Sequence, residues 1–137
     1  YVAYDKALKA NPSNLGILNN YSYFLAIDNK DLDKAEKMSS QTIKAEPLNP
    51  TYLDTYGWVL FKQKAYSMAK IYIENGIENT KDKGEISAEV YEHYGDVLYM
   101  TGEKEKALEY WIKAKEVGDS ESKTLDRKIE TKEYIEE

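Results

Sequence analysis

The sequence predicts an all-α protein built from repeated helical hairpins, and three observations support this fold class. A tyrosine, a small residue and a leucine recur together at Tyr21, Tyr56 and Tyr94, which are 35 and 38 residues apart. Around each copy the apolar residues follow the i, i+3, i+4, i+7 spacing of a helix with one buried face. A short polar break and a second apolar-periodic stretch follow each copy. A period of this length with two helices indicates a hairpin repeat.

The composition suits such helices and narrows the classes of function. Of the 137 residues, 42% are hydrophobic and 32% are charged, which fits helices with one buried and one solvated face. The net charge of -6 argues against nucleic-acid binding. The chain has no cysteine, so disulfides and thiolate chemistry are excluded. No apolar run approaches the length of a membrane span.

Residues 1–14 are expected to form the second helix of a preceding repeat. Ala7 and Pro12 lie where Thr42 and Pro47 lie in the next repeat. This helix lacks a predicted first helix to pack against, so we expect further repeats upstream in a longer protein, of which this chain is the C-terminal part. If no repeat precedes it, its exposed apolar face should drive self-association through this uncapped N-terminal end.

Three full repeats are predicted at residues 15–49, 50–87 and 88–121. Each has a small residue directly after its tyrosine: Ser22, Gly57 and Gly95. Two helices approach closely only where side chains are this small. A leucine at either glycine would therefore overpack the hairpin, at a cost of roughly 1–3 kcal/mol. The second repeat ends in a longer connection at 79–87, which is expected to change its stacking angle on the third.

The final segment, residues 122–137, is expected to form a C-terminal capping helix. Leu125 and Ile129 lie at i and i+4 among charged residues. A solenoid must cover the apolar face of its last repeat, and a helix with one narrow apolar stripe does so while its outer face stays solvated.

These landmarks resemble the tetratricopeptide repeat (TPR) family. The third repeat matches the family pattern best, with these residues: Tyr91, Tyr94, Gly95, Leu98, Gly102, Ala107, Trp111 and Ala114. The first two repeats depart from it at the turn, where Asn29 and Lys64 replace a glycine. The resemblance covers nearly the whole chain. It implies an all-α, right-handed α-α superhelix, a TPR solenoid of antiparallel helical hairpins.

The resemblance also implies a concave groove lined by the first helices, on which the family commonly holds a partner segment. It places nine residues of this chain in that groove: Asn19, Tyr23, Asp54, Trp58, Phe61, Glu92, His93, Asp96 and Tyr99. Such a groove is aromatic in its middle and acidic toward the third repeat. A protein or peptide with an apolar anchor and basic residues would fit it.

Simpler interpretations of these residues stay open. The aromatic residues would also suit packing between neighbouring first helices, and an acidic protein carries carboxylates everywhere. One subclass of the family, which clamps the acidic C-terminus of heat-shock chaperones, uses lysine, arginine and asparagine along the groove. The matching positions here include Tyr23, Thr55 and Glu89, so the basic residues are missing. We therefore do not expect that ligand.

A catalytic or metal-binding role would have to involve His93, which is the only histidine. It shares adjacent faces of one helix with Glu89, Glu92 and Asp96, a set that could bind a divalent metal or act as a general base. A solvated helix face that includes one histidine explains the same pattern. We therefore expect no enzyme, no cofactor and no metal site.

The expected function is a non-enzymatic protein–protein interaction scaffold. The alternative is a structural assembly or self-association element of a larger repeat protein, with the groove occupied by its own chain or by a neighbouring copy. The Tyr-Gly-x-Val-Leu copies also resemble repeat proteins of bacterial cell envelopes. The compartment, bacterial periplasm or cell envelope against cytoplasm, is left open.

Overall fold

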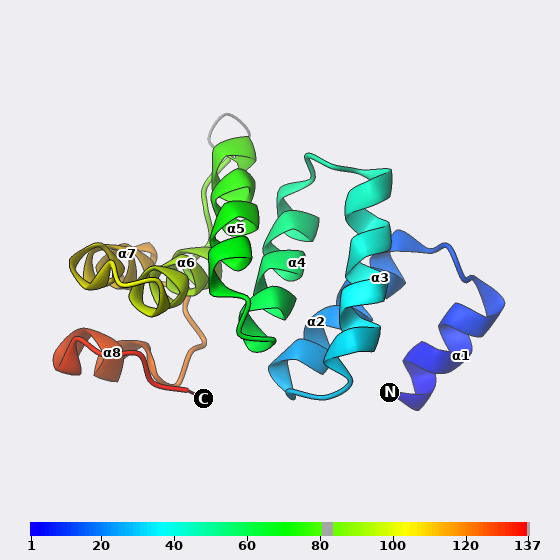
Figure 1. Cartoon of the computed structure of the whole chain (residues 1–137), viewed down its shortest axis with the longest axis horizontal. Helices are drawn as coiled ribbons and strands as arrows, with labels where there is room; N and C mark the ends of the chain where they lie inside the picture. Colours follow the sequence, from blue (N-terminus) through cyan, green and yellow to red (C-terminus); the bar gives the residue numbers. More distant parts are fainter. Residues whose placement is uncertain (81–83, 137) are drawn as a thin grey trace.

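The computed structural model describes residues 1–80 and 84–136 of the chain. Within these residues it contains helices and no strand. The helices are α1 (Val2–Ala10), α2 (Leu15–Ile27), α3 (Leu32–Ala45), α4 (Pro50–Lys62), α5 (Tyr66–Thr80), α6 (Ala88–Met100), α7 (Lys104–Val117) and α8 (Leu125–Thr131). Figure 1 shows them as successive hairpins along the long axis, with α1 at one end and α7 and α8 at the other. The predicted all-α solenoid of helical hairpins is thus confirmed.

Each hairpin pairs a first helix with the helix that follows it: α2 with α3, α4 with α5 and α6 with α7. Neighbouring hairpins contact each other through α3 and α4 and through α5 and α6. The first helices also contact one another in order, α2 with α4 and α4 with α6. These three helices therefore line one continuous face of the solenoid, which is the concave face on which the groove was expected.

The first helices begin with the same local signal. The side chains of Asn14, Asn49 and Ser87 each accept a hydrogen bond from a backbone N–H in the first turn of the helix that follows. Such a cap satisfies an amide that would otherwise lack a partner, which is typically worth about 1 kcal/mol. These caps set the start of α2, α4 and α6, and with it the positions of their concave side chains.

The small residues lie where the helices of a hairpin touch. A Cβ atom added to Gly57 would lie 2.5 Å from Cγ1 of Ile73 on α5. One added to Gly95 would lie 2.5 Å from Cδ1 of Trp111 on α7. Even an alanine would therefore force the Ile73 or Trp111 side chain to shift. The close approach that the recurring glycine predicts is present in both hairpins.

The turns between paired helices have the same left-handed conformation with or without a glycine. Asn29, Lys64 and Gly102 occupy the same place in their hairpins, with positive φ angles of 54°, 67° and 94°. This left-handed conformation suits glycine and is disfavoured for side chains such as that of lysine. The first two repeats therefore keep the geometry of the turn without its usual residue.

The remaining helices flank the three hairpins. Helix α1 packs on α2, where the Tyr21 hydroxyl donates to Oδ1 of Asp5 at 2.8 Å. Helix α8 packs on α7. The expected long connection at 79–87 includes residues 81–83, which lie outside the described residues. No described helix combines the length and the apolar character needed to cross a membrane.

Candidate functional site on the concave face

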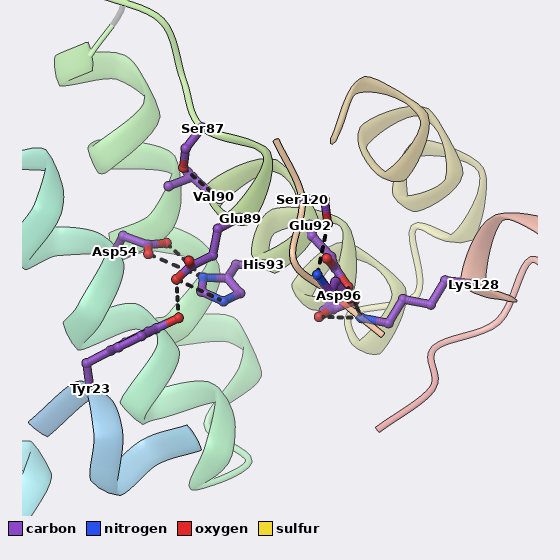
Figure 2. Close-up of polar contacts among 11 residues, drawn as sticks. Tyr23, Asp54, Ser87, Glu89, Val90, Glu92, His93, Asp96, Ser120 and Lys128 are labelled. Atoms are coloured by element: carbon purple, nitrogen blue, oxygen red, sulfur yellow. Dashed lines mark hydrogen bonds and ion pairs between the residues drawn. The ribbon is translucent and has the colours of Figure 1, made fainter. Parts of the chain in front are cut away.

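The nine predicted groove residues all lie on α2, α4 and α6. All but Tyr23 and Tyr99 are buried: Asn19, Asp54, Trp58, Phe61, Glu92, His93 and Asp96. At Glu92 and Asp96 the burial involves residues 118–136, here called the C-terminal segment, because Ser122 and Lys128 of this segment contact the two carboxylates. Figure 2 shows Lys128 of α8 reaching toward Glu92 and Asp96. The acidic end of the groove is thus occupied from within the chain.

Lys128 forms a buried ionic cluster with two carboxylates. Its Nζ lies 2.7 Å from Oε2 of Glu92 and 2.9 Å from Oδ1 of Asp96. The Lys128 side chain is only 4% exposed. Removing an ammonium from water to this degree is costly unless charged acceptors replace the lost water. The two carboxylates provide that replacement and so make the burial of Lys128 possible.

Two further hydrogen bonds orient the carboxylates. Trp111 Nε1 donates to Oδ1 of Asp96 at 3.0 Å, and the Ser122 hydroxyl donates to Oε2 of Glu92 at 2.8 Å. Burial raises the pKa of Asp96 to about 6, although attraction to Lys128 opposes the rise. Glu92 and Asp96 share one ammonium, so the cluster has an excess of negative charge whenever both are ionised. This excess favours a cation at the position of Lys128.

An adjacent side of α6, at His93, packs against α4. His93 Nδ1 lies 3.2 Å from both carboxylate oxygens of Asp54. Its ring stacks on Trp58 with centroids 3.8 Å apart, and Trp58 stacks on Phe61 with centroids 4.6 Å apart. These side chains fill the junction between the second and third hairpins. Trp58 therefore packs between first helices, the simpler of the two interpretations that the sequence left open. Phe61 instead contacts Trp58, Tyr66 of α5 and Tyr134 of the C-terminal segment.

His93 is charged more readily than an ordinary histidine in this junction. Burial by itself lowers the pKa of His93, but attraction to Asp54 and a hydrogen bond from the ring to that carboxylate outweigh it, and the net pKa is raised. Asp54 and His93 then form a buried ion pair. Trp58 covers one face of the imidazole, so a ligand in the groove would not reach that face.

The sequence grouped Glu89, Glu92, His93 and Asp96 as one constellation, and the structure divides it. Glu92 and Asp96 face Lys128, whereas His93 faces Asp54 (Figure 2). Glu89 lies beside His93, on the side away from Lys128. The Glu89 carboxylate accepts a hydrogen bond from the Tyr23 hydroxyl.

One atom each from Asp54, Glu89 and His93 lie within 4.8 Å of one another, which is close enough to share a metal ion. The hydrogen bond between Asp54 and His93 accounts for this proximity without an ion, and a raised His93 pKa favours a proton over a metal on the ring.

A cleft of about 700 Å³ remains on the concave face. Its walls are formed by the first helices on one side and by the C-terminal segment on the other, with these residues among them: Tyr23, Ile27, Trp58, Lys62, Glu89, Ser120, Lys123 and Tyr134. Ile27 is 43% exposed and gives this cleft an apolar edge. The floor of the cleft extends to Glu92, Asp96 and Lys128.

Sequence reasoning missed the residues of the C-terminal segment that line the site, above all Lys128. A signal for it exists. Lys128 lies three residues after Leu125 and one before Ile129, so it belongs to the buried stripe of the predicted capping helix. Glu92 and Asp96 form an i, i+4 pair of like charges that requires a cation when buried. Nothing in the sequence, however, indicates which lysine of the segment pairs with them.

The fold of this chain is found again among solved structures of other proteins. Neither a protein-family model nor a curated protein matches the chain. Among solved structures, YrrB, a TPR protein with an unusual peptide-binding site, is 21% identical with a TM-score of 0.67 over 85% of this chain, which spans 58% of YrrB.

Two further solved structures share the fold at lower sequence identity. The first TPR of Spaghetti (RPAP3), bound to the HSP90 peptide SRMEEVD, is 13% identical with a TM-score of 0.70 over 86% of this chain and 89% of its own. TTC0263, a TPR protein of Thermus thermophilus, is 14% identical with a TM-score of 0.72 over 94% of this chain and 69% of its own. The chain therefore has the fold of the tetratricopeptide repeat proteins, which its repeat motif predicts.

Proposed function

We propose that this chain is a non-enzymatic protein-interaction scaffold that holds a segment of a partner protein in its concave cleft. The observation that carries the proposal is the cleft itself, which stays open although most of the surrounding groove is filled. Its volume of about 700 Å³ accommodates several side chains of an extended segment. Two proteins of the same fold, YrrB and the RPAP3 repeat, are described with a peptide-binding site and a bound peptide.

The lining of the cleft indicates what kind of segment would bind. Ile27 and the edge of Trp58 offer apolar contact, and Glu89 offers a half-exposed carboxylate beside them. An apolar side chain with a basic neighbour complements these groups. An acidic segment such as the HSP90 peptide would be repelled by Glu89, so we do not expect the fold likeness to RPAP3 to extend to its ligand.

A selection from a library of displayed random peptides tests this proposal, with the full chain as bait. Ile27→Glu places a charge at the apolar edge of the cleft without disturbing the core. The matched control is Ile71→Glu on α5, because Ile71 is 57% exposed and does not line the cleft. We expect selected peptides to bind Ile27→Glu at least about tenfold more weakly than the wild type and to bind the control unchanged.

Equal binding of the selected peptides to the wild type, to Ile27→Glu and to Ile71→Glu would contradict the proposal. Melting curves of the three proteins, which should coincide, establish that the comparison is between folded chains. A selection that yields no binding peptide at all would count equally against the cleft as a docking site for segments.

A further inference from the structure

The acidic end of the groove is a lysine-binding site that the chain fills with its own Lys128, and we propose that a lysine-bearing segment of a partner protein competes with the C-terminal segment for it. This inference rests on the proposed function, because it names the chemistry of the partner for the same concave face. Four features of the structure support it.

The site stays formed when the lysine leaves. Trp111, which holds Asp96 through its Nε1, is fully buried in the contact between α6 and α7 and belongs to the core of the third hairpin. Glu92 and Asp96 lie one turn apart on the same rigid helix. Asp96 therefore keeps its hydrogen bond without the segment, whereas Glu92 loses the one from Ser122. Both carboxylates then lack the ammonium of Lys128. A pre-formed pair of this kind binds a cation at little cost in ordering.

The geometry suits lysine in particular. Nζ of Lys128 donates to Glu92 at 2.7 Å and to Oδ2 of Asp96 at 3.1 Å, so one compact ammonium bridges two carboxylates on the same helix face. The ammonium also lies 5.3 Å from the ring centroid of Tyr134. An arginine presents a broad planar fork that matches one carboxylate edge-on, and it would need more room than a site with a 4% exposed side chain provides.

Polar and ionic contacts hold much of the C-terminal segment. Besides the contacts of Lys128, Asp119 accepts from the Ala88 amide, Ser122 donates to Glu92 and Asp126 pairs with Lys115. Helix α8 has seven residues, of which only Leu125 and Lys128 are buried. A helix this short is not stable by itself. Beyond α8, the segment contacts α4 through Tyr134, which lies edge-on to Phe61, and through an ion pair in which Glu136 is 65% exposed. The proposal requires that the segment leaves the groove while the three hairpins stay folded.

The lysine site and the open cleft are continuous. Glu92, Asp96 and Lys128 line the same cavity as Ile27 and Trp58. A partner segment that lies in the cleft with an apolar residue near Ile27 would thus place a following lysine at the carboxylate pair. The attached segment acts at a high effective concentration, on the order of millimolar for a short link. A partner overcomes this advantage only by using the cleft and the lysine site together.

A binding experiment with the chain's own sequence as probe tests the inference. The probe is a synthetic fluorescent peptide of residues 120–136, and the proteins are the full wild-type chain and the full Lys128→Met variant. We expect the variant to bind the peptide at least about tenfold more tightly than the wild type, because its own segment no longer competes. A peptide with Lys128→Met should bind neither protein. The matched control is Arg127→Met, in the chain and in the peptide, because Arg127 is an exposed cation on the same helix.

Several results would overturn the inference. One is equal binding of the unmodified peptide and the Lys128→Met peptide to the variant chain, and another is a folded variant that binds no peptide. If Lys128→Met does not fold, Leu125→Ala provides the same test, since it loosens the segment while the charges stay. A wild-type dimer that depends on Lys128 in light scattering would identify a second copy as the occupant and would also overturn the partner proposal.

The outcome is separable from that of the proposed function. Displayed peptides that depend on Ile27 but contain no essential lysine would leave the interaction scaffold in place and would refute the lysine site alone.

Discussion

Two neighbouring residues of α6, His93 and Asp96, are buried by contacts of different kinds. His93 of α6 faces α4, where it stacks on Trp58 and pairs with Asp54. Asp96, three residues later, faces α8 and pairs with Lys128. The first contact joins two hairpins by aromatic packing, and the second joins a hairpin to the C-terminal segment by charge. Equivalent repeat positions, Trp58 and Asp96, thus carry opposite chemistry.

The difference separates a structural contact from an exchangeable one. Aromatic rings that stack in a buried junction stabilise the fold through the area that they remove from water. A buried ion pair gains little net stability, because the loss of hydration offsets most of the attraction. Such a pair is selective instead, since only another cation can replace Lys128. The aromatic junction should therefore determine global stability, and the ionic cluster should determine what occupies the groove.

The largest effect is expected from Trp58→Ala. The change removes the ring that lies between His93 and Phe61 and leaves a cavity in the junction of the second and third hairpins. Large-to-small changes at such sites cost about 3–5 kcal/mol of unfolding free energy. Urea denaturation followed by circular dichroism measures the loss. Ile71→Ala, at an exposed position, should change stability by no more than about 0.5 kcal/mol. Similar losses for the two variants would mean that the junction is not the structural contact.

The next effect is a fall in stability with rising pH, to which both regions contribute. The pKa of Asp96 is raised to about 6 from 3.8, so the folded state holds this proton more tightly than the unfolded state. Its stabilising contribution is complete below pH 3.8 and is lost as the pH rises through about 6. The pKa of His93 is raised above 6.5, so its contribution is complete below pH 6.5 and is lost as the pH rises through the folded value.

We therefore expect the free energy of unfolding to fall by about 1–3 kcal/mol between pH 5 and pH 8. Urea denaturation at a series of pH values checks this. Asp96→Asn should remove most of the dependence near pH 6, whereas Asp5→Asn, at the surface of α1, should not. A stability that is constant or rises over this range would show that Asp96 does not carry its proton to about pH 6.

A smaller effect is expected from Ser122→Ala, which affects only the ionic region. The change removes the hydroxyl that donates to Glu92 at 2.8 Å and leaves the ion pair with Lys128 in place. Loss of one hydrogen bond to a charged group weakens the docking of the C-terminal segment by roughly 1–2 kcal/mol. Amide exchange within α8 should then be about 5- to 30-fold faster, with no change in α4. Faster exchange in both helices would contradict the separation of the two regions.

The sequence predicts the repeated parts of this molecule well. The Tyr-Gly-x-Val-Leu copies identify the hairpins, and the glycines identify their contacts, because both follow from local helical periodicity. It also indicates the concave positions of Trp58 and Asp96. Whether such positions are open depends on contacts between residues far apart in the chain. The path of the C-terminal segment, which directs Lys128 back onto α6, follows from no local pattern.

The most direct test of the exchangeable contact is hydrogen–deuterium exchange of the full chain with Lys128→Met, compared with Arg127→Met. We predict that the backbone amides of Lys128 to Thr131 in wild-type α8 are protected, and that position 128 and its neighbours lose this protection in Lys128→Met while amides of α4 keep theirs. Arg127→Met should match the wild type. Protection of α8 that survives Lys128→Met, or is lost together with that of α4, would contradict the claim that one lysine holds a separable segment in the groove.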